Sequence, residues 1–140
     1  MGKINLGRVI LGGLLAGVVI NISEFILNAV VLMRDMEEAL KALNLSPVGG
    51  GAIGIFVVQG FVMGIVTVWL YAAIRPRFGP GPRTALLAGL VVWFLTPVLA
   101  SVGFLVMGFF PAKPVAIGIV WTLAELLLAS VAGAWLYKEE

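Results

Sequence analysis

Two carboxylic acids and several amides lie inside otherwise apolar stretches of the chain. Glu24 is flanked by Asn21 and Asn28, at steps of 3 and 4 residues. Glu125 follows Thr122 by 3 residues. On a helix such spacings place each group along one side. Carboxyl groups with amide and hydroxyl neighbours can bind a proton or a cation, or can hydrogen-bond helices to one another. The residues expected at this site are Glu24, Glu125, Asn21, Asn28, Thr122 and Gln59.

Composition excludes the chemistry that needs other residue types. The 140-residue sequence contains no cysteine and no histidine. It therefore has no means of forming disulfides, thiolate nucleophiles, zinc fingers or haem-histidine bonds, and no imidazole base. We expect no enzymatic activity, no metal, no cofactor and no nucleic-acid partner. The net charge of +2 is interpreted as a signal of membrane topology.

Membrane-spanning helices are the elements that must position these acids. The chain is 61% hydrophobic and 11% charged, against about 25% charged residues in an ordinary soluble domain. Its long apolar intervals contain no charge except Glu24 and Glu125, and each is long enough for the roughly 20 residues that a spanning helix needs. The sequence predicts an all-α fold: one membrane domain, residues 1–140, with helices near 7–33, 50–74, 84–110 and 115–137.

The cations are distributed unequally between the two sides of this arrangement. Six of the nine fall on one side and three on the other: Lys3, Arg8, Arg75, Arg77, Arg83 and Lys138 against Arg34, Lys41 and Lys113. The larger set marks the cytoplasm. We therefore predict an up-down bundle with both termini inside, in a bacterial cytoplasmic membrane. Arg75, Arg77 and Arg83 are expected to face lipid headgroups from a loop rich in proline and glycine, at about 1 kcal/mol each.

The first outer loop is predicted to form a short amphipathic helix over residues 34–44. Asp35 and Glu38 are spaced as a capping box, and apolar side chains repeat along one face. The alternative is that the first spanning helix continues past the membrane. The pairing of Arg34 with Glu38 suits both possibilities equally.

Small residues form close-packing stripes along the spans, at steps of 3 and 4 residues. The stripes contain Gly13, Gly17, Gly60, Gly64, Ala129 and Gly133. In the first and fourth helices, the small and polar residues follow opposite orders along the chain, as expected for antiparallel partners. We predict that these two helices pack against each other, and that the third helix bends at Pro97.

This pairing would create a polar layer between helices one and four. It opposes Gly13 with Gly133, Gly17 with Ala129, Asn21 with Glu125, Glu24 with Thr122, and Asn28 with Gly118. At about 1.5 Å per residue, Asn21 and Glu125 both lie roughly 18 to 20 Å from the outer boundary. Side-chain hydrogen bonds would then clamp the two helices together.

Two functions are compatible with such a layer. In the first, Glu24 and Glu125 are protonated clamps in a small structural or accessory membrane protein, which acts among lipids, as a homo-oligomer or in a larger membrane complex. In the second, they serve a proton- or cation-coupled transporter of small molecules, because a charged carboxylate at the bilayer centre costs at least about 2.5 kcal/mol. The first is favoured, since no further translocation motif accompanies the acids.

Four short helices with an acidic residue in the first resemble the small multidrug resistance transporters in general architecture. The chain differs from them in its longer first connection, residues 34–49. It also carries Glu125 in the fourth helix, where that family has a glycine-containing dimerisation motif. The loop over residues 75–83, with the sequence RPRFGPGPR, is similar to loops of uncharacterised small bacterial four-span membrane proteins. That resemblance implies no particular activity.

Overall fold

The protein is an all-α membrane protein with four long helices, each apolar enough to cross a bilayer. The computed structural model describes residues 3–139, and no strand occurs among them. The spans are Leu6–Val31, Gly50–Phe78, Pro82–Val106 and Ala112–Leu136. The predicted all-α fold with four spanning helices is confirmed, and the predicted boundaries differ from these by a few residues.

Two of the four spans change helical type part-way along. The first consists of α1 (Leu6–Ile26) and a π-helical turn, η1 (Leu27–Val31). The third consists of α4 (Pro82–Trp93), a second π-helical turn, η2 (Phe94–Val98), and α5 (Leu99–Val106). Pro97 lies in η2, where its missing N–H interrupts the helical hydrogen bonds. The second and fourth spans are the uninterrupted helices α3 (Gly50–Phe78) and α6 (Ala112–Leu136).

The turn between α3 and α4 is shorter than predicted. Helix α3 passes through Pro76 and ends at Phe78, so Arg75 and Arg77 are helical and do not belong to a loop. A proline ring fixes a φ angle that a helix accepts. The chain leaves the helix only at Gly79 and Gly81, whose φ angles of 84° and 123° suit glycine.

The connection between the first and second spans contains the expected short helix, α2 (Met33–Ala42). Leu32, with φ −104° and ψ 8°, separates α2 from η1, so the first span does not simply continue. The predicted capping box at Asp35 is wrong. The helix begins before that residue, and its N-cap, Leu32, makes no side-chain hydrogen bond.

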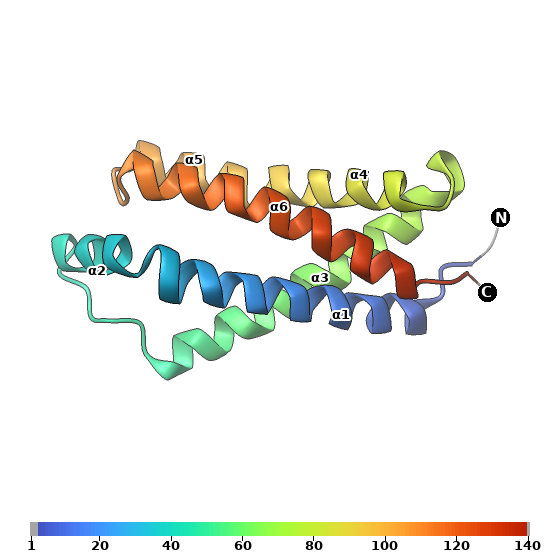
Figure 1. Ribbon diagram of the computed structural model, residues 1–140, viewed down its shortest axis with the longest axis horizontal. Coiled ribbons are helices and arrows are strands. Elements are labelled where there is room, and N and C mark those ends of the chain that lie inside the picture. Colours follow the sequence, from blue (N-terminus) through green and yellow to red (C-terminus); the bar gives the residue numbers. More distant parts are fainter. Residues whose placement is uncertain (1–2, 140) are drawn as a thin grey trace.

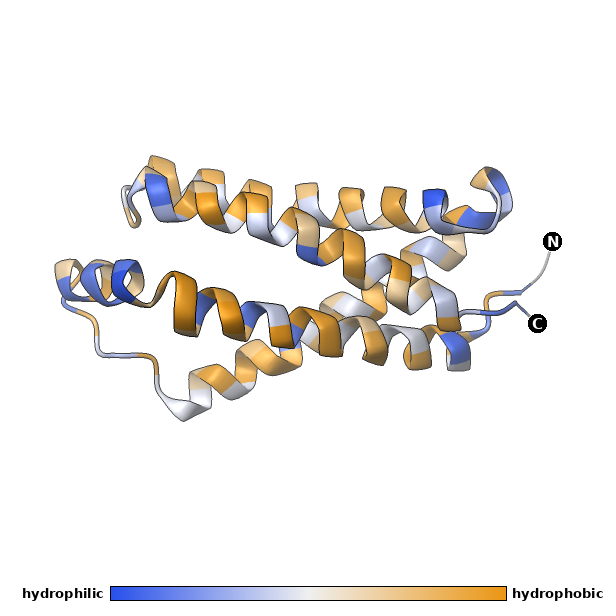
Figure 2. Cartoon of the chain, in the orientation of Figure 1, coloured by the Kyte–Doolittle hydropathy of each residue, from blue (hydrophilic) through white to orange (hydrophobic). Residues whose placement is uncertain are grey.

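The bundle is tightly packed at one end, and its helices diverge toward the other (Figure 1). Both chain ends and the α3–α4 turn lie at the packed end, whereas α2 and the α5–α6 connection lie at the diverging end (Figure 1). Within the described chain, η2 and α5 bury no residue, and the first buried residue of α3 is Gly60. Figure 2 shows hydrophobic residues along all spans, with hydrophilic segments at both ends and at a few positions within α1 and α6.

Candidate functional site

The glycine stripe of α1 packs against α3, not against α6. A Cβ atom at Gly13 would collide with the backbone of Ile65, and one at Gly17 would lie 2.8 Å from the Cα atom of Phe61. Gly64 of α3 meets the backbone of the same two glycines. The predicted pairs Gly13 with Gly133 and Gly17 with Ala129 are therefore wrong. The physical reason is that α1 turns this line of glycines toward α3, where Gly64 lets the two backbones approach closely.

A neighbouring line of small residues on α1 forms the contact with α6. A Cβ atom at Gly12 would collide with the carbonyl oxygen of Gly133, and a Cβ atom at Gly133 would lie 3.1 Å from the Cβ atom of Ala16. Ala129 is also completely buried. Helix α1 therefore uses two adjacent lines of small residues for two partners. Gly133 and Ala129 do belong to packed surfaces, and Gly133 meets Gly12, one position before the predicted Gly13.

The polar side chains of α1 continue these lines into the diverging half of the bundle. Asn21 donates from Nδ2 to the carbonyl oxygen of Gly17 at 2.9 Å and to that of Val57, in α3, at 3.2 Å. Asn28 donates from Nδ2 to Oε2 of Glu24 at 2.8 Å. Asn21 therefore joins two helices, while Asn28 and Glu24 form a pair within one helical turn.

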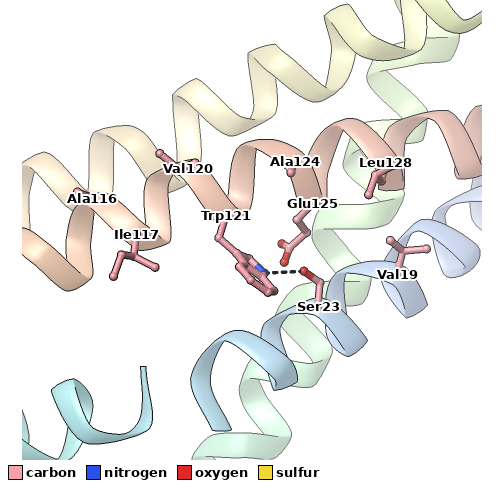
Figure 3. Close-up of a pocket in the computed structure, with 9 residues that line it drawn as sticks. All are labelled: Val19, Ser23, Ala116, Ile117, Val120, Trp121, Ala124, Glu125 and Leu128. Carbon is pink, nitrogen blue, oxygen red and sulfur yellow. Dashed lines mark hydrogen bonds between the residues drawn. The ribbon is translucent and has the colours of Figure 1, made fainter. Parts of the chain in front are cut away.

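Glu125 is the most enclosed acid in the described chain. Only 4% of its surface is exposed, and Oε2 has no hydrogen-bond partner. The Ser23 hydroxyl of α1 faces this carboxyl, and Trp121 donates from Nε1 to the Ser23 oxygen at 2.9 Å (Figure 3). Glu24 follows Ser23 directly in α1. Both acids therefore lie in the region where α1 meets α6.

Beside Glu125 lies a groove of about 660 Å³ between α1 and α6 (Figure 3). Its other walls are apolar apart from Ser23 and the indole nitrogen of Trp121. They are formed by Val19, Ser23, Ala116, Ile117, Val120, Trp121, Ala124 and Leu128. An acid in such surroundings lacks the water that would solvate its charge.

The cross-helix pairs expected for the polar residues are not formed. Thr122 donates to the carbonyl oxygen of Gly118 in its own helix, at 2.8 Å, and so does not pair with Glu24. Gly118 has no atom near the position of a Cβ, so it does not oppose Asn28. The predicted register is wrong because α1 turns its Asn21 side toward α3, which leaves Ser23 to face α6.

Gln59 lies apart from the acids. It is exposed on α3, and it makes no side-chain hydrogen bond with any described residue. The sequence gives only the position of Gln59 within an apolar stretch. Which side of α3 it occupies depends on packing, and the N-terminal part of that helix, before Gly60, has no buried face.

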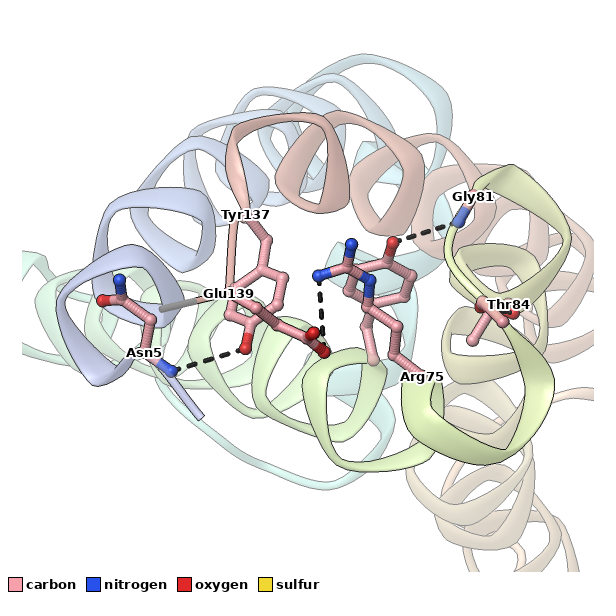
Figure 4. A network of polar contacts seen from close by, with 8 residues as sticks. Asn5, Arg75, Gly81, Thr84, Tyr137 and Glu139 are labelled. Carbon is pink, nitrogen blue, oxygen red and sulfur yellow. Dashed lines mark hydrogen bonds and ion pairs between the residues drawn. The ribbon is translucent and has the colours of Figure 1, made fainter. Parts of the chain in front are cut away.

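At the packed end, a second polar network ties the bundle together (Figure 4). The Tyr137 ring stacks edge-on against Tyr71, with ring centroids 5.8 Å apart. Arg75 lies over the Tyr137 ring at 5.6 Å and forms an ion pair with Glu139 at 3.4 Å. The Tyr137 hydroxyl accepts from the backbone N–H of Asn5 at 3.4 Å. The chain ends are thereby fixed to α3.

This network corrects one expectation about the arginines. Arg75 packs into the network and leaves only 20% of its side chain exposed, so it does not face lipid headgroups freely. The cause is the continuation of α3 through Pro76, which turns Arg75 toward Tyr137. Arg77 and Arg83 are exposed at the same end of the bundle, and their contact with headgroups stays a prediction.

Two residues of the site were not singled out from the sequence. A lone serine in a spanning helix is common, so Ser23 gives no signal of its own. Trp121 precedes Glu125 by 4 residues, so both share one side of α6. That spacing was the available signal.

The described residues contain no group of three or more His, Cys, Asp or Glu side chains that could hold a metal ion. Comparisons with known protein families, curated proteins and solved structures gave no match. The function must therefore be inferred from the chemistry of the site.

Proposed function

We propose that the protein is a proton- or cation-coupled membrane transporter in which Glu125 and Glu24 are the coupling groups. The observation that carries the proposal is the Oε2 atom of Glu125, which is buried without a partner among apolar side chains. A carboxylate there is costly unless it holds a proton or a cation. Coupled transport requires a group that exchanges one positively charged partner, such as a proton, for another.

The packing supports access to this site from one side only. The buried core occupies the packed end, where Tyr71, Tyr137 and Arg75 close the bundle. Toward the other end, η2 and α5 bury nothing, so the helices are packed less tightly on that side of the acids. A site open to one side and sealed from the other is one state of an alternating-access cycle.

The cation distribution supports an orientation for this state. Most lysines and arginines lie at the packed end, which the positive-inside rule places in the cytoplasm. The acids would then be accessible from the outer side of the membrane. The same rule places α2 outside the cell.

A structural or accessory role is the second candidate, because one side-chain hydrogen bond does join α1 and α6. That bond runs from Trp121 to Ser23. The acids themselves contribute less to such a clamp than expected, since Glu24 pairs with Asn28 inside α1. The unpartnered Glu125 oxygen therefore favours transport.

The proposal is tested by proton flux in reconstituted vesicles that enclose a pH-sensitive dye. The vesicles are challenged in turn with sodium chloride, potassium chloride and 1-adamantanamine hydrochloride, with protein-free vesicles as the background. We expect at least one cation to move protons above that background. Glu125→Gln should abolish the signal, because an amide cannot exchange a proton.

Glu37→Gln is the matched control, since Glu37 is an exposed acid of α2, far along the chain from the groove. It should leave the flux unchanged. If none of the three cations moves protons through the unaltered protein, transport is excluded in favour of the structural role. Equal flux through the Glu125→Gln protein would exclude Glu125 as the coupling group.

A further inference from the structure

The groove between α1 and α6 presents almost nothing that a polar molecule could bind. Its two neutral polar side chains, Ser23 and Trp121, are hydrogen-bonded to each other at 2.9 Å (Figure 3). The Oε2 atom of Glu125 is buried beneath the wall. A polar ligand needs hydrogen-bonding groups that fix its orientation. The groove therefore suits a hydrocarbon.

The groove is open to the bilayer because α1 and α6 diverge. On the α1 side it is lined only by Val19 and Ser23, and its other lining residues belong to α6. Val120 and Leu128 of α6 are 69% and 67% exposed. A space on the outside of a spanning helix is filled by the surrounding lipid, which within the membrane core means acyl chains.

The length of the groove matches one leaflet of the membrane. From Ala116 to Leu128 the wall follows 12 residues of α6, or about 18 Å at 1.5 Å per residue. A hydrocarbon core about 30 Å thick leaves about 15 Å for each leaflet. The volume of about 660 Å³ lies within the roughly 300–1,000 Å³ of small-molecule sites. A single acyl chain can therefore lie along the whole groove.

A positive charge lies at the end of the groove that is nearer the membrane surface. Steps of 4, 3 and 4 residues lead from Lys113 to Ile117, Val120 and Ala124, so the lysine shares one side of α6 with the groove. Lys113 is exposed and forms no ion pair with any described residue. A lysine near a helix end extends its ammonium group to the membrane surface. Lys113 can thus meet the phosphate of a lipid whose chain follows α6.

We propose that the α1–α6 groove binds an anionic phospholipid, with one acyl chain along α6 from Ala116 to Leu128 and the phosphate on Lys113. The lipid belongs to the leaflet at the diverging end of the bundle. Its chain supplies the apolar contact that α1 does not give to this part of α6, and it keeps water out of the groove beside Glu125. The inference goes beyond transport, because a structural protein with this groove would bind the same lipid.

Quenching of tryptophan fluorescence by brominated lipid tests the inference, since Trp121 lines the groove. A chain in which Trp121 is the only tryptophan, made with Trp69→Phe, Trp93→Phe and Trp135→Phe, is reconstituted in phosphatidylcholine vesicles. The vesicles contain rising fractions of phosphatidylglycerol or of phosphatidylcholine that carries bromine on its acyl chains. Phosphatidylglycerol should give half-maximal quenching at about a fivefold lower fraction, the effect of one lysine on an anionic lipid.

Two pairs of variants assign this preference to the groove. Lys113→Gln should abolish it, whereas Lys41→Gln, which removes an exposed lysine of α2 at the same end of the bundle, should keep it. Ala124→Phe should fill the groove and abolish the preference without a change of charge. Ala73→Phe, at an exposed alanine of α3 outside the groove, should keep it.

Circular dichroism of each variant shows whether its helices are retained. If the single-tryptophan chain does not fold, the difference in quenching between the unaltered protein and Trp121→Phe gives the same signal. Half-maximal quenching at equal fractions of the two lipids would overturn the inference. A preference that Lys113→Gln or Ala124→Phe leaves unchanged would overturn it as well. Neither result depends on proton flux, so this inference and the proposed function are tested separately.

Discussion

Gly64 is the position where one added methyl group should most clearly disturb the bundle. An alanine Cβ there would collide with the Gly13 carbonyl oxygen and would lie 2.5 Å from the nitrogen and 2.9 Å from the Cα atom of Gly17. All three are backbone atoms and cannot rotate away. An ordinary contact needs about 3.5 Å, so α1 would have to retreat by roughly 1 Å. A gap of that size forfeits about a quarter to a half of the local dispersion energy, and overpacking costs about 1–3 kcal/mol.

The matched control is Gly54→Ala, the same chemical change in the same helix. No atom lies within 4 Å of the position of a Cβ at Gly54, and alanine is favoured over glycine in a helix by up to about 1 kcal/mol. Unfolding by increasing dodecyl sulfate in mixed micelles, followed by circular dichroism, gives the free energy of unfolding. Gly64→Ala should lower it by about 1–3 kcal/mol, and Gly54→Ala should leave it unchanged or raise it. Equal stability of the two variants would refute the close α1–α3 contact.

Three further predictions concern the ends and the centre of the bundle. Trp121→Phe and Ser23→Ala remove the same cross-helix hydrogen bond, so a double-mutant cycle in the micelle assay should give a coupling free energy of about 0.6 to 2 kcal/mol. A coupling free energy of zero would mean that the bond does not stabilise the α1–α6 contact. Tyr71→Phe removes the hydroxyl that accepts from the backbone of the α3–α4 turn at 3.2 Å and should cost about 0.5–1.5 kcal/mol in that assay, whereas wild-type stability would exclude this contact as a tie. For topology, an impermeant thiol reagent added to intact cells should label a single cysteine placed at Asn44 and should not label one placed at Gly79. The reverse pattern would invert the proposed orientation.

The spans could be predicted from the sequence because the physical constraint is simple. A stretch without charges that is long enough to cross hydrocarbon forms a helix, since every backbone group must be satisfied internally. The short helix α2 was predictable from its amphipathic pattern. The π-helical turn η1 was not, because its sequence, Leu27–Val31, contains no proline or glycine that would indicate it.

The site could be predicted only in part. The two acids were evident because their cost in a membrane demands a reason. Their partners were not, because α1 carries two adjacent lines of small residues and periodicity does not say which line meets which helix. A shift of one position from Gly13 to Gly12 exchanges α3 for α6 as the partner. Farther along α1, Ser23, two residues after Asn21, takes the predicted place of Asn21 beside Glu125.

The protonation of Glu125 tests the central claim most directly. Infrared spectra of the reconstituted protein, recorded as the medium is stepped from acid to alkaline pH, report the band of the protonated carboxyl group. Glu24→Gln removes the carboxyl band of the other intramembrane acid, so the two contributions are distinguished. A carboxyl band that disappears reversibly as the pH rises, and that is missing from Glu125→Gln, is the predicted result. A difference spectrum that Glu125→Gln leaves identical to that of the unaltered protein would contradict the account.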